Sequence, residues 1–214
     1  MYNKIINIAR ELIMQRGIRS VTMDEIAAEA GISKRTLYEM FVNKEELLEN
    51  LLEFLWTEHS SIVKNIIENT PSCIIGILTV LKQKLGEHQH KYEPKQEHFF
   101  SDLKKIYPNV AEKSKQYSEK YLHFMAKHLE TGVKQKTVRN DVNLELASTL
   151  LIAQLEGLNS IKSIRQFHPT EIFSTLVLSF CRGISTEKGL MEIEEFVKEN
   201  QIFSQKYDKK MDLI

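Results

Sequence analysis

Apolar side chains recur every three or four residues along almost the whole chain, and this spacing is typical of amphipathic α-helices. In the first such segment, residues 2–16, the positions that share one helix face are Ile5, Ile8, Ala9, Leu12 and Ile13. No segment shows the alternation of a half-buried strand. The 214 residues include only eight glycines and four prolines, whereas sandwiches, barrels and disordered chains need many turn residues or low hydrophobicity. The sequence therefore predicts an all-α fold.

Charge and cysteine content restrict the classes of partner. Basic and acidic side chains number 29 each, so any nucleic-acid surface must be local. Cys73 and Cys181 lack the spacing of a zinc site or a disulfide framework, and we interpret them as buried thiols. The N-terminus lacks an apolar secretion signal, and the most apolar segment, residues 146–158, is too short to cross a bilayer. We expect a cytoplasmic protein without a membrane partner.

Start and stop signals in the first third of the chain predict four helices, over residues 2–16, 23–30, 34–41 and from 44 to about 66. Gly17 and Gly31 end the first two helices, because glycine tolerates the positive φ of a helix terminus. The expected N-terminal caps are Thr22 with Glu25, Ser33, and Asn43 with Glu46. Further helices are expected over residues 71–87, around Phe99 and Phe100, and over 110–135, 144–164, 169–184 and 191–203, with a loop at 87–97.

The two short helices at residues 23–30 and 34–41, joined by a turn at 31–33, predict a helix-turn-helix. The side chains expected between them are Ile26, Ala27, Ala30, Leu37, Met40 and Phe41. Arg35 and Glu39 fall on the opposite face of the second helix, which is slender enough to enter a major groove. A polar-faced helical hairpin inside some other all-α protein is the alternative interpretation.

The polar residues of this segment suit distinct roles on DNA. Arg35 can donate two parallel hydrogen bonds to a guanine, and Thr36 can contact a thymine methyl or a base edge. Tyr38 and Lys44 are better placed for phosphates, which set register without reading sequence. The N-termini of the two short helices, at Thr22 and Ser33, add backbone N–H donors for phosphate oxygens.

Glu39 does not suit a phosphate-facing surface. We interpret it as the partner of Arg35 in an i,i+4 ion pair. Recognition of a cytosine by its carboxylate is the alternative.

Residues 22–47, TMDEIAAEAGISKRTLYEMFVNKEEL, resemble the DNA-binding signature of the tetracycline-repressor (TetR) family, and the similarity extends back through Ala9 and Gly17. The resemblance implies an all-α homodimer whose small N-terminal domain binds a palindromic operator. It also implies a larger C-terminal domain that dimerises and binds a small effector. Position by position, the resemblance implies that Thr22 and Lys44 hold phosphates and that Tyr38 contacts the DNA backbone. It also implies that Lys34, Arg35 and Thr36 face the bases.

The two expected helices at 144–164 and 169–184 are apolar over too wide an arc to bury one face alone. We expect one face to meet the core and the other a second copy of the chain, in a four-helix interface. The expected interface residues are Leu150, Ala153, Gly157, Ile161, Phe173, Leu176, Val177 and Phe180. Two-fold symmetry would place the recognition helices about 34 Å apart, in successive major grooves. Burial of both helices within one subunit is the alternative.

An effector site is expected among aromatic and polar residues of the middle helices. With Trp56, the candidates are Phe99, Phe100, Tyr107, Tyr121, Phe124, Met125, His128 and Gln154. They predict a cavity for a small apolar or amphipathic molecule, although an aromatic stripe at this spacing is also typical of an ordinary core.

The sequence offers little for catalysis or cofactor binding. It has no glycine-rich phosphate loop, nucleophile elbow or spaced metal-ligand set. The residues His88, His90, Glu93, Glu97 and His98 are interpreted as a solvated loop rather than a metal site. We expect that the protein is not an enzyme and that it binds neither a cofactor nor a metal.

These observations predict a ligand-responsive homodimeric repressor of transcription. Residues 1–46 would form the DNA-binding domain, and residues 47–214 would bind the effector and dimerise. The rival functions are an architectural or partner-controlled DNA binder without a small effector and, with less support, an enzyme on an all-α scaffold.

Overall fold

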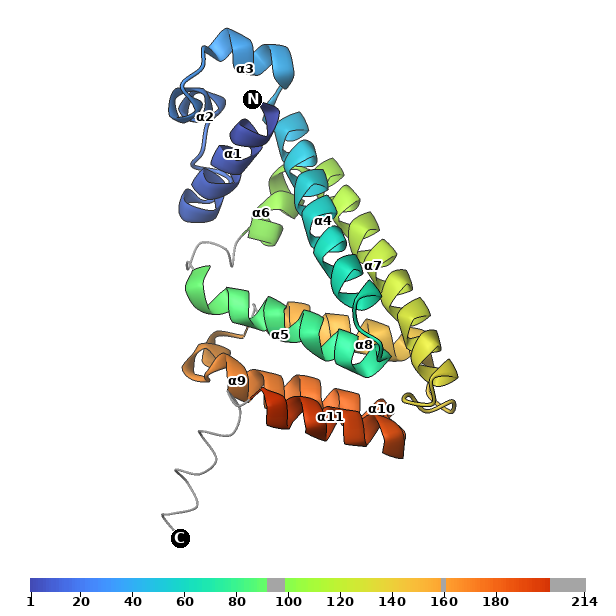
Figure 1. Ribbon diagram of the computed structural model, residues 1–214. Coiled ribbons are helices and arrows are strands. Elements are labelled where there is room, and N and C mark those ends of the chain that lie inside the picture. Colours follow the sequence, from blue (N-terminus) through green and yellow to red (C-terminus); the bar gives the residue numbers. More distant parts are fainter. Residues whose placement is uncertain (92–98, 159–160, 201–214) are drawn as a thin grey trace. The chain divides into compact units, whose positions relative to one another are not determined.

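The computed structural model describes residues 1–91, 99–158 and 161–200, and these form helices joined by short connections (Figure 1). In chain order the elements are α1 (Tyr2–Arg16), α2 (Met23–Ala30), α3 (Lys34–Met40), α4 (Lys44–Glu68), α5 (Cys73–Lys91), α6 (Phe99–Ile106), α7 (Pro108–Lys134), α8 (Leu144–Gly157), η3 (Lys162–Gln166), α9 (Pro169–Ile172), η4 (Phe173–Leu178), α10 (Ser179–Ile184) and α11 (Glu187–Glu199). Within the described ranges, extended pairing is limited to one isolated bridge between Val138 and Ser185. The all-α prediction is confirmed.

Helix boundaries agree with the sequence prediction in the first third of the chain and depart from it later. The loop expected at 87–97 is wrong for residues 87–91, because α5 continues to Lys91. Polar side chains do not by themselves end a helix, and the nearest breaker, Pro94, lies beyond that point, outside the described residues. The helix expected over 144–164 ends at Gly157, a residue of low helix propensity, and a 3₁₀ turn, η3, follows.

The last two helices also differ in detail from the expectation. The segment 169–184 is continuously helical but contains π-type turns in η4. The final helix begins at Glu187 rather than near Met191, because the hydroxyl of Thr186 accepts a hydrogen bond from the Gly189 backbone N–H and caps it. No helix in the described part of the chain has the length and apolar character needed to span a membrane.

The chain divides into two compact units. Unit 1 contains Met1–Ser61 and Tyr92–Lys120, and unit 2 contains Ile62–Lys91 and Tyr121–Ile214. Both α4 and α7 therefore contribute residues to each unit. A boundary at residue 46 stays a prediction.

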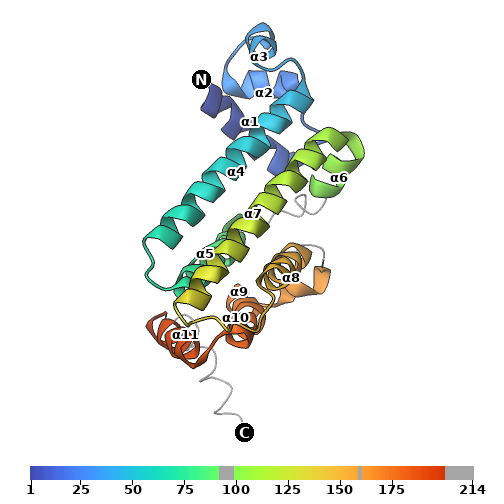
Figure 2. The same ribbon diagram turned by 90° about the vertical axis from the view of Figure 1, so that its right-hand side faces the viewer.

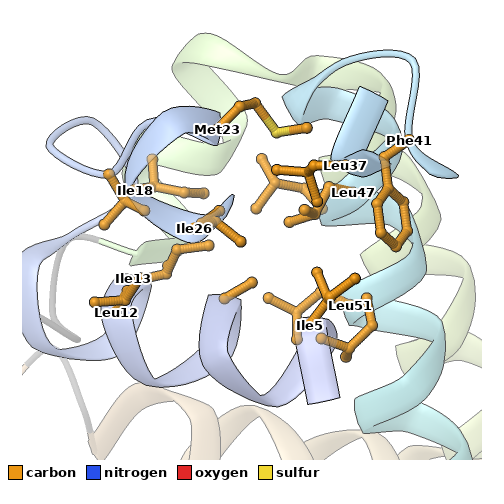
Figure 3. Close-up of a cluster of buried hydrophobic side chains, with 14 of the residues drawn as sticks. Ile5, Leu12, Ile13, Ile18, Met23, Ile26, Leu37, Phe41, Leu47 and Leu51 are labelled. Carbon is orange, nitrogen blue, oxygen red and sulfur yellow. The ribbon is translucent and has the colours of Figure 1, made fainter. Parts of the chain in front are cut away.

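Unit 1 is built around one apolar cluster beneath the helix-turn-helix. Ile5 and Ile13 of α1, Ile26 of α2 and Leu37 of α3 point into this cluster, and each is almost fully buried (Figure 3). Leu47 and Leu51 of α4, together with Phe41, close the same core. Complete burial of such side chains removes apolar surface from water and provides the main stabilisation of the three small helices.

Polar and aromatic contacts join the later helices of unit 1 to its core. The first part of α4 lies beside the first part of α7 (Figure 1; Figure 2). Glu49 of α4 pairs with Lys113 of α7, and the Trp56 ring stacks on Tyr117 with 5.3 Å between centroids. Arg19, in the loop after α1, pairs with Asp102 of α6 at 2.9 Å. The helix-turn-helix is thus supported by α4, α6 and α7.

Unit 2 centres on α5, which packs against α9, η4 and α11. Cys73 of α5 and Cys181 of α10 are buried free thiols, as the sequence predicted. Burial raises the pKa of each thiol to about 12, so both stay protonated and unreactive near neutral pH.

Candidate functional site

Two glycines provide the backbone turns that position the helix-turn-helix. Gly31 follows α2 with φ 70°, and its backbone N–H donates to carbonyls at the end of that helix. Gly17 ends α1 with φ 84°. Positive φ values strain any residue with a Cβ, so glycine at both positions fixes where the first two helices stop.

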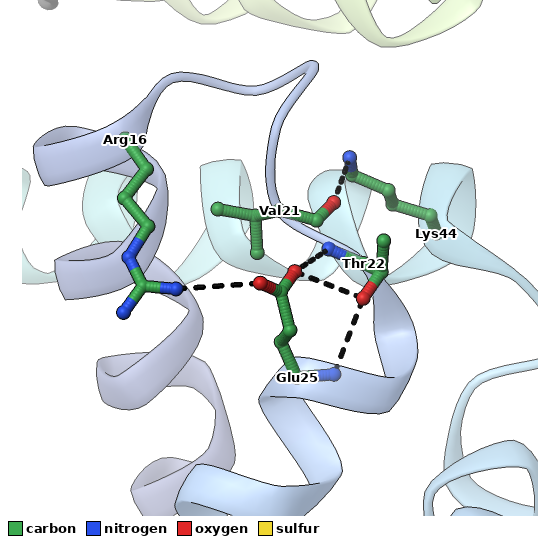
Figure 4. Close-up of polar contacts among 5 residues, drawn as sticks. All are labelled: Arg16, Val21, Thr22, Glu25 and Lys44. Atoms are coloured by element: carbon green, nitrogen blue, oxygen red, sulfur yellow. Dashed lines mark hydrogen bonds and ion pairs between the residues drawn. The ribbon is translucent and has the colours of Figure 1, made fainter.

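The start of α2 is held by the predicted capping box (Figure 4). The Thr22 hydroxyl accepts from the Glu25 backbone N–H at 3.2 Å, and the Glu25 carboxylate accepts from the Thr22 backbone N–H at 2.8 Å. These hydrogen bonds lower the pKa of Glu25, with further contributions from Arg16 and Lys44. The Thr22 hydroxyl thus caps α2 in the structure. Its contact with a phosphate stays a prediction.

Lys44 lies at the start of α4, half-buried beside the same loop. Its ammonium group donates to the backbone carbonyl of Val21, in the loop before Thr22 (Figure 4), and also to that of Ile18 in the same loop. Burial lowers the pKa of Lys44, and the nearby Glu25 carboxylate opposes that shift. Lys44 therefore braces the loop between α1 and α2, and its role on phosphate stays a prediction.

Helix α3 presents a polar face outward and an apolar face inward, as the sequence predicted. Leu37 is fully buried, whereas the Arg35 side chain is 88% exposed and Tyr38 is 48% exposed. Ser33 caps the helix by accepting from the Thr36 backbone N–H at 3.0 Å. The predicted base- and phosphate-contacting residues 33–36 and 38 therefore lie together on one short element.

Each exposed cation of α3 already has an acidic partner. Arg35 Nε donates to Glu39 Oε1 at 2.9 Å, which confirms the ion pair predicted for Glu39. Lys34 pairs with Asp24 of α2. Sequence spacing could not reveal the second pair, because its members lie on different helices and not three or four residues apart on one. The first 46 residues hold seven basic and seven acidic side chains, so the region has no excess of positive charge.

The predicted dimer residues separate into surface and interior groups. Leu150, Ala153 and Ile161 are exposed, and Gly157, Leu176 and Phe180 are half-buried. Phe173 and Val177 are almost fully buried within the single chain, so they offer little surface to a partner, and their place in an interface stays a prediction. Their helical segment, η4, packs against α5, and periodicity alone could not distinguish the inner from the outer apolar face.

An exposed apolar stripe remains along α8. It includes Leu146, which is 54% exposed, and Leu150, which is 49% exposed one turn later. Two exposed leucines one turn apart could be covered by a partner, and that interface stays a prediction.

The predicted effector residues are divided between the two units. Tyr107 belongs to unit 1 and packs against its core, whereas Tyr121, Met125 and His128 are in unit 2. Phe124 and Gln154 are exposed in the single chain. Phe99 and Phe100 lie in α6, but their side chains fall outside the described part of the structure, as do those of the histidine-rich segment from His88 to His98. Elsewhere in the described ranges, no group of three side chains could hold a metal ion.

His128 is the most unusual polar group of unit 2. Its Nε2 atom is buried, and no residue of the described part of the chain forms a hydrogen bond with it. Gly76 of α5 lies close to this atom, since a Cβ at residue 76 would be 3.4 Å from Nε2. Burial lowers the pKa of His128, so the ring is neutral near pH 7.

A groove of about 940 Å³ runs along α11 in unit 2. Its apolar lining includes Leu178, Leu190 and Met191, and the ion pair between Arg182 and Glu194 also lines it. Among the predicted effector residues whose side chains the structure describes, none lines this groove.

Together, the glycine turn, the capped helices and the outward polar face of α3 define a helix-turn-helix DNA-binding protein. Residues 5–51 match the family described as "Bacterial regulatory proteins, tetR family". This segment therefore carries the DNA-binding domain of the TetR family, which is a family of DNA-binding regulators rather than of enzymes.

Curated relatives and solved structures extend the similarity beyond the matched segment. The HTH-type transcriptional repressor KstR2 of Rhodococcus jostii (strain RHA1) is 27% identical over 154 residues, covering 69% of this chain and 72% of the relative. The uncharacterized HTH-type transcriptional regulator YvkB of Bacillus subtilis (strain 168) is 28% identical over 193 residues, 86% of this chain and 97% of the relative. The structure of FadR from Bacillus subtilis in complex with stearoyl-CoA has a TM-score of 0.70 at 18% identity, over 85% of this chain and 97% of that chain. The last likeness shows a shared fold.

Proposed function

We propose that the protein is a ligand-responsive homodimeric repressor that binds a palindromic operator. The observation that carries this proposal is the orientation of α3, with Leu37 and Phe41 buried and Arg35 and Tyr38 facing outward. An amphipathic helix presented this way can place its polar side chains on the base edges of a major groove. The repressor name of the KstR2 relative favours repression over activation.

The apolar stripe of α8 supports the dimer. Leu146 and Leu150 on α8 are exposed in one chain, as is Ile161 just before η3, and Leu176 and Phe180 are half-buried on the later segment 169–184. Two copies related by a two-fold axis could bury these side chains in a four-helix interface. The same symmetry would match an operator with two inverted half-sites.

The proposed effector is a small amphipathic molecule bound in unit 2. Acyl-CoA is a suitable class, because the similar fold of FadR from Bacillus subtilis was solved with stearoyl-CoA. The buried Nε2 of His128 supplies a polar group without a partner in the described chain, and it accepts a hydrogen bond when the ring is neutral.

Release of DNA would require the ligand to favour one arrangement of the protein over another. Helix α4 contains residues of both units and begins at Lys44, which braces the loop before α2. A ligand that binds more tightly to a different arrangement of α4 would lower operator affinity. The factor of that decrease cannot exceed the ratio of the ligand's affinities for the two arrangements.

Selection of binding sites from random DNA by the purified protein tests the proposal. We expect an inverted repeat with half-site centres about one helical turn apart, and weaker binding to it when stearoyl-CoA or a related acyl-CoA is present. Absence of any preferred sequence would contradict the proposed function. A palindrome whose binding no acyl-CoA or other small ligand changes would instead favour the architectural or partner-controlled alternative.

Arg35→Ala should relax sequence preference at one position of each half-site. Removal of the guanidinium should lower discrimination there by about 1–3 kcal/mol, the value of a bidentate contact with guanine. Competition titrations with operators substituted one base pair at a time measure this loss. The matched control is Lys64→Ala, which removes an exposed cation from α4 in unit 2 and should leave the pattern of preference unchanged. Equal weakening on all sequences would show that Arg35 contacts phosphate instead.

A further inference from the structure

The Arg35–Glu39 pair lies on the outward face of α3. Arg35 is 88% exposed and Glu39 is 59% exposed, and the two side chains meet one helical turn apart at 2.9 Å. The intervening Leu37 is buried in the core of unit 1, so the pair points away from that core. A single exposed i,i+4 pair adds little to stability, and its position on the recognition helix suggests another use.

The geometry of the pair determines what Arg35 can still bind. Glu39 accepts from Nε, which leaves the two terminal guanidinium nitrogens for another acceptor. Guanine presents two neighbouring acceptors, O6 and N7, to such a pair of donors. Glu39 therefore orients the guanidinium while leaving its base-reading edge available.

The charge of Glu39 has the opposite effect on the DNA backbone. Non-specific binding depends on cations that replace the counterions of phosphates. On α3 the Arg35 charge is offset by Glu39 and the Lys34 charge by Asp24, and the first 46 residues carry equal numbers of acidic and basic groups. Phosphates repel a carboxylate on any DNA, and this repulsion weakens binding most where no base contact offsets its cost.

We infer that Glu39 is a specificity-determining residue: it orients Arg35 toward a guanine and, by its negative charge, weakens binding to DNA that lacks this base. The inference rests on the proposed sequence-specific binding of DNA by α3. Glu39 acts through Arg35 and through charge, and it does not itself read a base.

Glu39→Gln separates charge from shape, because the amide oxygen can still accept from Arg35 Nε. We expect affinity for random-sequence DNA to rise about three- to tenfold at low salt, with a salt slope steeper by about one unit. Affinity for the selected operator should stay nearly the same, so the ratio of specific to non-specific affinity should fall about three- to tenfold. Glu39→Ala, which also removes the acceptor, should lower that ratio further.

The matched control is Glu11→Gln, which removes one negative charge from an exposed position on α1. It should leave the ratio unchanged. In an Arg35→Ala background, Glu39→Gln should lower the ratio less than it does in the unmodified protein, since the two residues act as a unit.

Two results would overturn the inference. The ratio could be the same for Glu39→Gln and the unmodified protein. Alternatively, Glu39→Gln could remove preference at a single cytosine to the same extent with and without Arg35, which would make Glu39 a direct base reader. Failure of the unmodified protein to prefer any DNA sequence would overturn the proposed function itself.

Discussion

Leu150→Glu should convert the protein to a monomer and remove most of its operator affinity. Leu150 is 49% exposed on α8, in the centre of the apolar stripe. In a two-fold interface the substitution would bury two unpaired carboxylates, which is strongly unfavourable. Loss of the second, linked half-site contact should reduce operator affinity about 100- to 10,000-fold. Sedimentation or light scattering gives the mass, and titration with a full operator and a single half-site gives the two affinities.

Met191→Glu is the control for this prediction. It makes the same replacement at an exposed apolar side chain of unit 2, on α11 rather than α8. We expect a dimer and unchanged operator binding. A Leu150→Glu protein that keeps its dimeric mass would show that the α8 stripe is not the interface.

Phe41→Ala should unfold the helix-turn-helix or leave it marginally stable. Phe41 is 1% exposed, follows α3 directly, and contacts Tyr2 with 5.7 Å between ring centroids. Removal of a fully buried phenylalanine typically costs about 3–5 kcal/mol. The expected result is loss of DNA binding at ordinary temperatures, with dimerisation retained because the proposed interface lies in unit 2.

The single tryptophan provides the measurement. Trp56 lies in unit 1, stacked on Tyr117, so its fluorescence reports the unfolding of that unit in denaturant. Val42→Ala is the neighbouring control, since Val42 is 73% exposed and its truncation should change the midpoint little. Similar midpoints for Phe41→Ala and Val42→Ala would contradict the proposed role of the unit 1 core.

The features that could be predicted from sequence are those fixed by neighbours along the chain. The glycine termini at residues 17 and 31 and the capping box at Thr22 and Glu25 depend on a few adjacent residues, and all are present in the structure. The Arg35–Glu39 pair likewise follows from helical spacing. These local signals explain why the helix-turn-helix was predicted almost residue by residue.

The features that could not be predicted depend on contacts between distant segments. The use of Lys44 to brace the carbonyls of residues 18 and 21, and the pairing of Lys34 with Asp24, required the fold. Periodicity marked two apolar faces on the segment 169–184 without showing which one the single chain buries, so it could not reveal that Phe173 and Val177 are interior. The effector residues came from an aromatic pattern that a core and a binding site share, and they stay a prediction.

The central claim is that two copies of α3 enter major grooves on one operator, and cleavage of DNA from a tethered reagent tests it directly. A cysteine at position 42, from Val42→Cys, would be exposed just beyond α3, whereas Cys73 and Cys181 are buried and their raised pKa values protect them from labelling. With an iron chelate attached there, we predict two symmetric clusters of cleavage whose centres lie about ten base pairs apart. A single cluster, or cleavage spread evenly along the fragment, would contradict the account.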